Sequence, residues 1–153
     1  MKTTLFALLI TTITTTALVA TVPAGDAAMM PAPRTITIEC ANQHEAGKDD
    51  VYLVLEQGGA TLNFHGVAGG SRQSPYKMGT GMTWNVANQI GAKVEPNSGG
   101  QPVLLKLMER DVFQDDTFGS VSISSGAFAN GPVVQHMNGK INGVYYHYIV
   151  TIQ

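Results

Sequence analysis

Hydrophobic and polar residues alternate along several short runs of the chain, and turn-forming residues separate these runs. The runs cover residues 35–40, 50–56, 60–65, 103–108, 120–124, 133–137 and 143–152. In the clearest of them, residues 103–108, Val103, Leu105 and Leu107 share one face. A period of two predicts strands with one buried face. Residues 50–56 are apolar on both faces, which is typical of a central strand in a packed sheet.

The middle of the chain adds short segments that the pattern does not fully define. Residues 76–78 and 82–86 are predicted as a further pair of strands, with one helical turn at residues 86–90 as an alternative. Asn130-Gly131 and Asn138-Gly139 are predicted turns. We therefore predict seven or eight strands and no long helix, which favours an all-β fold: a single antiparallel β-sandwich over residues 35–153.

The first residues of the chain are typical of an export signal. Lys2 precedes an apolar stretch that begins at Leu5, and small residues follow between Ala20 and Ala28. We predict a signal peptide over residues 1–28 with an open choice of cleavage site, then a proline-containing linker over residues 29–34. The predicted location is therefore secreted, or extracellular, with an uncleaved anchor as the alternative.

Charge and cysteine content exclude several classes of partner and cross-link. The formal net charge of the 153-residue chain is -2, which gives no basis for nucleic-acid binding. Cys40 is the only cysteine, so an intrachain disulfide is impossible. Its alternation with Ile36 and Ile38 predicts a buried thiol. The domain must therefore be stabilised by its core or by a metal.

Acidic residues gather at two places next to strongly predicted strands. The group after residues 103–108 consists of Glu109, Asp111, Asp115 and Asp116, and the group before strand 50–56 consists of Asp49 and Asp50. Clustered carboxylates repel one another unless solvent or a cation lies between them. Calcium prefers six to eight oxygen ligands on flexible loops, so a calcium cofactor is one prediction. Acidic residues that serve only solubility are the alternative.

Two motifs resemble those of the C-two (C2) domain, a calcium- and phospholipid-binding β-sandwich. Residues 47–53, Gly-Lys-Asp-Asp-Val-Tyr-Leu, resemble the family's early loop and strand start, with Asp50 at the aspartate position. Residues 108–119 resemble its late acidic loop, where Glu109 and Asp111 form an acidic pair and Asp116 precedes Gly119. The pattern is also similar to that of small secreted microbial proteins of uncharacterised function.

The resemblance implies a set of ligands and a partner. The implied calcium ligands are Asp50, Glu109, Asp111 and Asp116, with Asp49 and Asp115 as auxiliaries. Because the family's first early aspartate falls near His44 or Glu45, one calcium site is expected instead of two. The resemblance also implies that Val112 and Phe113 contact a phospholipid membrane or another cell-surface ligand. Because the sequence shows no catalytic motif, we expect a module that is not an enzyme. The alternative is that Phe113 folds inward against the sandwich edge.

Two other functional classes remain open. A secreted hydrolase or toxin would use a carboxylate pair such as Glu109 and Asp111. A metal-free structural or inhibitor protein would need neither a bound metal nor a catalytic carboxylate pair. The chain's four histidines, His44, His65, His136 and His147, show no metal-binding sequence spacing. None of them is predicted as a ligand.

Overall fold

The computed structural model describes residues 33–96 and 99–153. Within these ranges the chain forms nine strands and one short helix. The elements are β1 (Ile36–Asn42), β2 (Asp49–Gln57), β3 (Ala60–Leu62), β4 (Tyr76–Met78), β5 (Thr83–Asn85), α1 (Asn88–Gly91), β6 (Val103–Glu109), β7 (Asp116–Ile123), β8 (Val133–Ile141) and β9 (Val144–Ile152). The predicted signal peptide and the linker before Pro33 lie outside the described residues and stay predictions.

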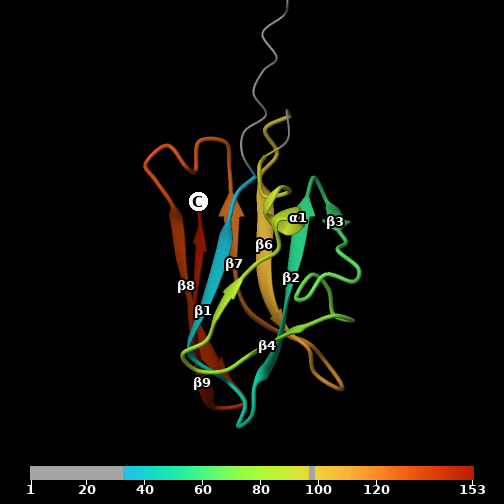
Figure 1. The fold of residues 1–153 in the computed structure, drawn as a ribbon, viewed down its shortest axis with the longest axis vertical. Coiled ribbons are helices and arrows are strands. Elements are labelled where there is room, and N and C mark those ends of the chain that lie inside the picture. Colours follow the sequence, from blue (N-terminus) through green and yellow to red (C-terminus); the bar gives the residue numbers. More distant parts are fainter. Residues whose placement is uncertain (1–32, 97–98) are drawn as a thin grey trace, which may run out of the picture. The chain divides into compact units, whose positions relative to one another are not determined.

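The strands form two antiparallel sheets that pack as the layers of a sandwich (Figure 1). Sheet A has the order β5-β1-β9-β8. Sheet B has the order β3-β2-β6-β7, and β4 also pairs with β2. The predicted all-β sandwich is confirmed, although the described strands exceed the expected seven or eight. No helix within the described residues has the length and apolar character to cross a membrane.

Alternating side chains from both sheets build the core. Val103, Leu105 and Leu107 of β6 are fully buried, as the sequence predicts, and β2 and β7 flank this strand. From sheet A, Ile38 and Cys40 of β1 point into the same cluster. The buried thiol is therefore confirmed, and the pKa of Cys40 is raised, chiefly by burial. The apolar layer between the sheets is continuous, which is the main source of stability in a domain without a disulfide.

A bulge in β7 places one aromatic ring in this core. The register with β6 shifts between the pairs Leu107–Gly119 and Met108–Thr117, so Phe118 has no partner in β6. Its ring packs 4.6 Å from the ring of Tyr148 and 4.9 Å from that of Tyr146, centroid to centroid. The Tyr146 hydroxyl donates to the Phe118 carbonyl at 2.9 Å. The bulge therefore fixes the start of β7 against β9.

The predicted turn at Asn138-Gly139 is wrong. Both residues belong to β8, where Gly139 pairs with Tyr146, and a Cβ on Gly139 would lie 2.7 Å from the hydroxyl oxygen of that tyrosine. The hairpin turns instead at Asn142 and Gly143, whose φ angles are +48° and +85°. Positive φ at both central positions is the requirement of the tight turn that matches strand twist.

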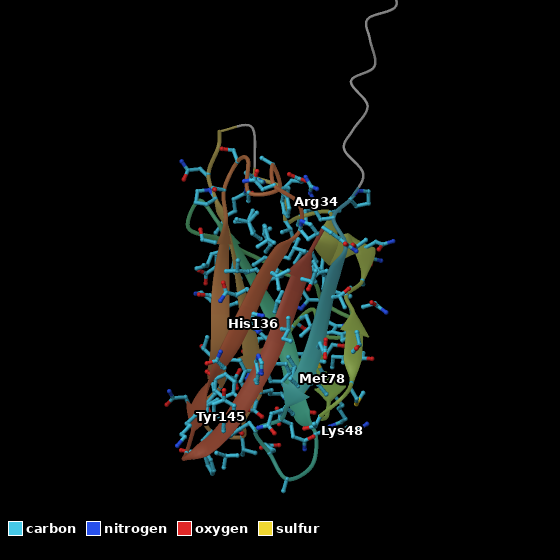
Figure 2. All side chains as sticks on the ribbon, turned by 90° about the vertical axis from the view of Figure 1, so that its left-hand side faces the viewer. Arg34, Lys48, Met78, His136 and Tyr145 are labelled. Carbon is cyan, nitrogen blue, oxygen red and sulfur yellow. The ribbon has the colours of Figure 1, made fainter. Side chains whose placement is uncertain are left out.

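Three connections meet at one end of the sandwich, which we call the site end. They are the β1–β2 loop, the β6–β7 loop and the β8–β9 turn, at the lower end of Figure 1. Lys48 and Tyr145 mark the same end in Figure 2. The two predicted acidic groups lie at the start of β2 and between the end of β6 and the start of β7, so the fold brings both groups to this end.

The core predicts a sharp contrast between neighbouring leucines of β6. Leu105→Ala removes a fully buried side chain and should lower the free energy of unfolding by about 2–5 kcal/mol. Leu104→Ala acts on the opposite, half-buried face and should cost about 1 kcal/mol or less. Urea denaturation of the two variants measures the difference. An equal loss of unfolding free energy in the two variants would contradict the assignment of Leu105 to the buried face of β6 and Leu104 to the opposite face.

Candidate functional site

The carboxylate of Asp49 is the most completely bonded group at the site end. It is fully buried, and the backbone N–H groups of His44 and Glu45 donate to it at 2.9 Å. The hydroxyl of Tyr148 on β9 also donates to it. These bonds fold the β1–β2 loop over the start of β2. Burial and the hydrogen bond to Asp49 raise the pKa of Tyr148, so the hydroxyl stays protonated.

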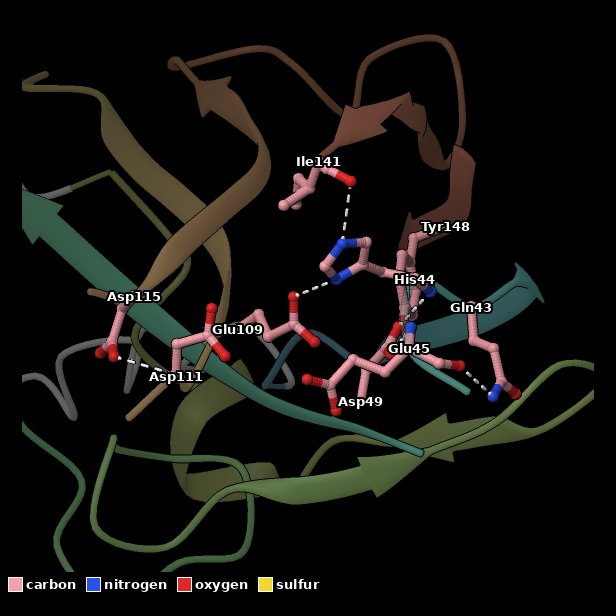
Figure 3. A network of polar contacts seen from close by, with 9 residues as sticks. All are labelled: Gln43, His44, Glu45, Asp49, Glu109, Asp111, Asp115, Ile141 and Tyr148. Atoms are coloured by element: carbon pink, nitrogen blue, oxygen red, sulfur yellow. Dashed lines mark hydrogen bonds and ion pairs between the residues drawn. The ribbon is translucent and has the colours of Figure 1, made fainter. Parts of the chain in front are cut away.

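Glu109, the last residue of β6, lies next to Asp49 inside the protein. Its side chain is 1% exposed, and Oε2 lies 2.9 Å from Nδ1 of His44. The other ring nitrogen of His44, Nε2, lies 3.0 Å from the carbonyl oxygen of Ile141. Figure 3 shows the imidazole between Ile141 and Glu109, with Asp49 and Tyr148 close by.

The environment changes the acid–base properties of this pair. Burial, followed by the charge of Asp49, raises the pKa of Glu109 to about 7, although His44 opposes the shift. Burial acts to lower the pKa of His44, but the charge and hydrogen bond of Glu109, together with the Ile141 carbonyl and the charge of Asp49, outweigh it and the pKa is raised. Both shifts favour the protonated form of the side chain.

Asp50 lies on the opposite face of β2 from Asp49. Its carboxylate accepts hydrogen bonds from Lys77, at 2.6 Å, and from Arg110. Burial acts to raise the pKa of Asp50, but these two cations outweigh it and hold the pKa below its ordinary value. The predicted ligand Asp50 is therefore already neutralised by side chains of the protein.

Asp115 is also neutralised by the protein and holds the β6–β7 loop together. It accepts hydrogen bonds from Tyr52 and Arg72 at 2.6 Å and from the backbone N–H of Asp111 at 3.2 Å. Arg72 also donates to the carbonyl of Asp111 at 2.7 Å. Burial acts to raise the pKa of Asp115, but the hydrogen bonds from Arg72 and Tyr52 lower it below its ordinary value.

Asp111 and Asp116 are half-buried at the surface. Together with Asn142, Phe113 and neighbouring loop residues they line an open hollow of about 520 Å³. Within the described part of the chain, neither carboxylate forms an ion pair. Val112 and Phe113, at the tip of the loop, are 87% and 100% exposed. The alternative in which Phe113 folds inward is therefore wrong.

The six acidic residues predicted as ligands thus fall into three environments. Asp49 and Glu109 are buried together, Asp50 and Asp115 are paired with cations, and Asp111 and Asp116 are open. Their role as metal ligands stays a prediction. His44 was missed because it is 65 residues from Glu109 in sequence. The only sequence signal was its place near the position of an aspartate in the C2 motif.

Comparisons with known proteins return C2 domains among solved structures. No protein-family model and no curated protein matches the chain. A solved C2 domain has a TM-score of 0.36 and 14% identity, covering 78% of this chain and 96% of its own. A two-domain C2 structure of extended-synaptotagmin 2 gives 0.36 and 15%, with 97% of this chain covered. A calcium-bound structure of the same two domains gives 0.35 and 14%, with 80% of this chain covered.

Solved C2 domains are thus among the structures to which this chain is similar. The chain spans about half of the length of the two-domain structures, at 47% and 46%. The TM-scores and identities are low, so these similarities carry no argument about function.

The buried contact between Tyr148 and Asp49 generates a stability prediction. Tyr148→Phe keeps the ring but removes one hydrogen-bond donor from a buried carboxylate, so it should lower the free energy of unfolding by about 1–3 kcal/mol. The matched control is Tyr145→Phe on the same strand, whose side chain is exposed. Urea denaturation in the presence of a chelator compares the two. An equal, negligible effect in both would show that the hydroxyl does not support Asp49.

Proposed function

We propose that the protein is a non-enzymatic, secreted module that binds phospholipid surfaces through the tip of the β6–β7 loop. The observation that carries the proposal is the outward position of Val112 and Phe113, two adjacent apolar side chains exposed at 87% and 100%. Burying such side chains in an apolar layer contributes about 1.5–3 kcal/mol each. A protruding apolar tip is therefore suited to enter the boundary between headgroups and acyl chains.

The loop is held in the outward position by its own hydrogen bonds. Asp115 accepts from Tyr52, Arg72 and the Asp111 backbone, so the segment that carries the tip is fixed on three sides. A pre-formed tip loses less conformational entropy on binding than a flexible one. This supports the assignment of Val112 and Phe113 as contact residues.

A cationic rim lies beside the tip. We use this name for Lys48, Arg72, Lys77 and Arg110, which line a hollow of about 470 Å³ together with Val112 and three acidic residues. Lys77 and Arg110 both pair with the carboxylate of Asp50. Lys77, Arg110 and Asp50 together therefore carry one net positive charge. Anionic headgroups attract basic groups near the surface by about 1 kcal/mol per residue. Glu45 and Asp111 also line the hollow, which leaves its lining with a net charge of +1, and Arg72 is paired with Asp115, so the attraction of the rim for an anionic lipid is weak.

Calcium fits one part of the site end. Within the described residues, Asp111 and Asp116 form no ion pair and, unlike the fully buried Asp49, lie at the surface, where they border the hollow that Phe113 and Asn142 also line. Two carboxylates with the oxygen atoms of an amide and of lipid phosphate are ligands that calcium prefers. We therefore propose one calcium ion that Asp111 and Asp116 hold at the lipid surface, where it would neutralise the acids beside Phe113.

The hydrolase alternative receives less support from the geometry. It pairs Glu109 with Asp111, but the Glu109 side chain is 1% exposed and faces His44. A substrate would have to displace the β1–β2 loop to reach it.

Secretion rests on residues 1–28, so the proposed place of action depends on the predicted export signal.

The apolar tip is tested by liposome cosedimentation. Phe113→Ser should weaken binding to anionic vesicles by roughly 10-fold or more, because it removes about 1.5–3 kcal/mol of apolar burial. Val134→Ser is the control, since Val134 is also exposed but lies on β8 away from the tip. Stability should be unchanged in Phe113→Ser because the ring contacts solvent. Equal binding by the two variants would overturn the role of the tip.

The calcium proposal is tested by comparing substitutions of the unpaired acids, Asp111 and Asp116, with a substitution of Asp115, which is paired with Arg72. Asp111→Asn with Asp116→Asn should remove the calcium dependence of vesicle binding while leaving the melting temperature in chelator nearly unchanged. Asp115→Asn should instead lower the melting temperature, because Arg72 loses its charged partner. Calorimetric calcium titration and melting curves measure both effects. Calcium binding that survives the double substitution would contradict the assignment.

A further inference from the structure

Three side chains with metal-binding atoms face one another beneath the site end. Ligand atoms of His44, Asp49 and Glu109 all lie within 4.8 Å of one another. Asp49 is fully buried, Glu109 is 1% exposed, and the His44 side chain is 9% exposed. They come from the β1–β2 loop, the start of β2 and the end of β6, so the fold assembles them from three separate segments.

One oxygen of this group is buried without a partner. Within the described residues, Oε1 of Glu109 accepts no hydrogen bond, although Oε2 faces His44. Leaving a buried acceptor unsatisfied costs about 1–3 kcal/mol, and more for a charged group. Asp49 adds a second carboxylate beside it, and His44 supplies at most one positive charge. The cluster therefore has one unsatisfied acceptor, and its two carboxylates can carry more negative charge than His44 can neutralise.

The imidazole is oriented so that its lone pair faces the carboxylates. A carbonyl oxygen only accepts, so Nε2 of His44 carries the hydrogen that it donates to Ile141. In the neutral ring the lone pair is then on Nδ1, the atom next to Glu109. Metal-binding histidines are typically held in this way, with the second ring N–H donated to a carbonyl. Asp49 is likewise fixed by Tyr148 and two backbone N–H groups.

The mixed donor set decides which ion fits. Calcium and magnesium take oxygen ligands, whereas imidazole nitrogen with carboxylate oxygen suits zinc and related transition metals. We propose that His44 Nδ1, Asp49 and Glu109 bind one zinc-class divalent ion, with a water in the fourth position. The ion takes the place of the proton between His44 and Glu109, which passes to solvent, and no redox step is involved.

Such an ion would link the β1–β2 loop directly to sheet B and, through the hydrogen-bond partners of its ligands, indirectly to sheet A. Asp49 and Glu109 belong to sheet B, while the ligand partners Ile141 and Tyr148 belong to sheet A. Metal binding to a folded site adds directly to folding stability. The site is independent of the proposed lipid contact, because its ligands are buried and Val112 and Phe113 are not among them.

The proposal is tested by titrating the full chain, stripped with a chelator, with Zn²⁺ in a calorimeter and by following its melting temperature. One zinc per chain and a higher melting temperature are expected, and magnesium at the same concentration should give neither. Glu109→Gln keeps the size of the side chain but removes its charge, and it should weaken zinc binding by at least about a hundredfold. Absence of zinc binding by the unaltered chain would overturn the proposal.

His136 and His147 provide the matched control. Nδ1 of His136 and Nε2 of His147 lie 3.1 Å apart on the exposed face of sheet A (Figure 2 labels His136). This pair is therefore a competing binding site for a transition metal. His136→Ala with His147→Ala should leave zinc affinity unchanged. Histidine nitrogen NMR of the unaltered chain needs no variant to fold: zinc should shift the His44 resonances first. A shift confined to His136 and His147 would overturn the assignment.

Discussion

The buried carboxylate of Asp49 is the interaction on which the site end depends. Burying such a group is costly unless donors surround it. The donors come from the β1–β2 loop and from Tyr148 on β9, so Asp49 joins the first residue of β2 to the opposite sheet. The resulting path of the loop brings His44 to Glu109, which lies 65 residues away in sequence. Because neighbouring residues of a strand point to opposite faces, Asp50 is directed outward and is neutralised by cations instead.

The sequence predicted the sandwich because alternation is a local property of each strand. The buried faces of β6 and β1 follow directly from it, as does the position of Cys40. The bulge at Phe118 and the long β8 hairpin were not predictable in this way, because they depend on the rings of Tyr146 and Tyr148 packing from another strand. An Asn-Gly pair occurs at both 138–139 and 142–143, and the contact of Gly139 with Tyr146 decides between them.

The site was predicted less completely, since sequence clustering records proximity along the chain but not orientation. All six acidic residues do reach one end of the fold. The lysine and arginine partners of Asp50 and Asp115 come from residues 72–110, and nothing in the acidic motifs indicates them. His44 was excluded by a rule on sequence spacing that applies to ligands on one helix, whereas here three segments contribute one ligand atom each.

Residues 109–111 connect the buried cluster to the exposed loop. Glu109 faces His44, Arg110 is held by Asp50, and the backbone of Asp111 is bonded to both Asp115 and Arg72. Because each of the three is fixed by a different partner, the direction in which the loop leaves β6 is set from inside the protein. The tip at Val112 and Phe113 is exposed as a consequence of this anchoring. A bound ion at Glu109 would therefore stiffen the base of the loop without altering the charges that face a lipid surface.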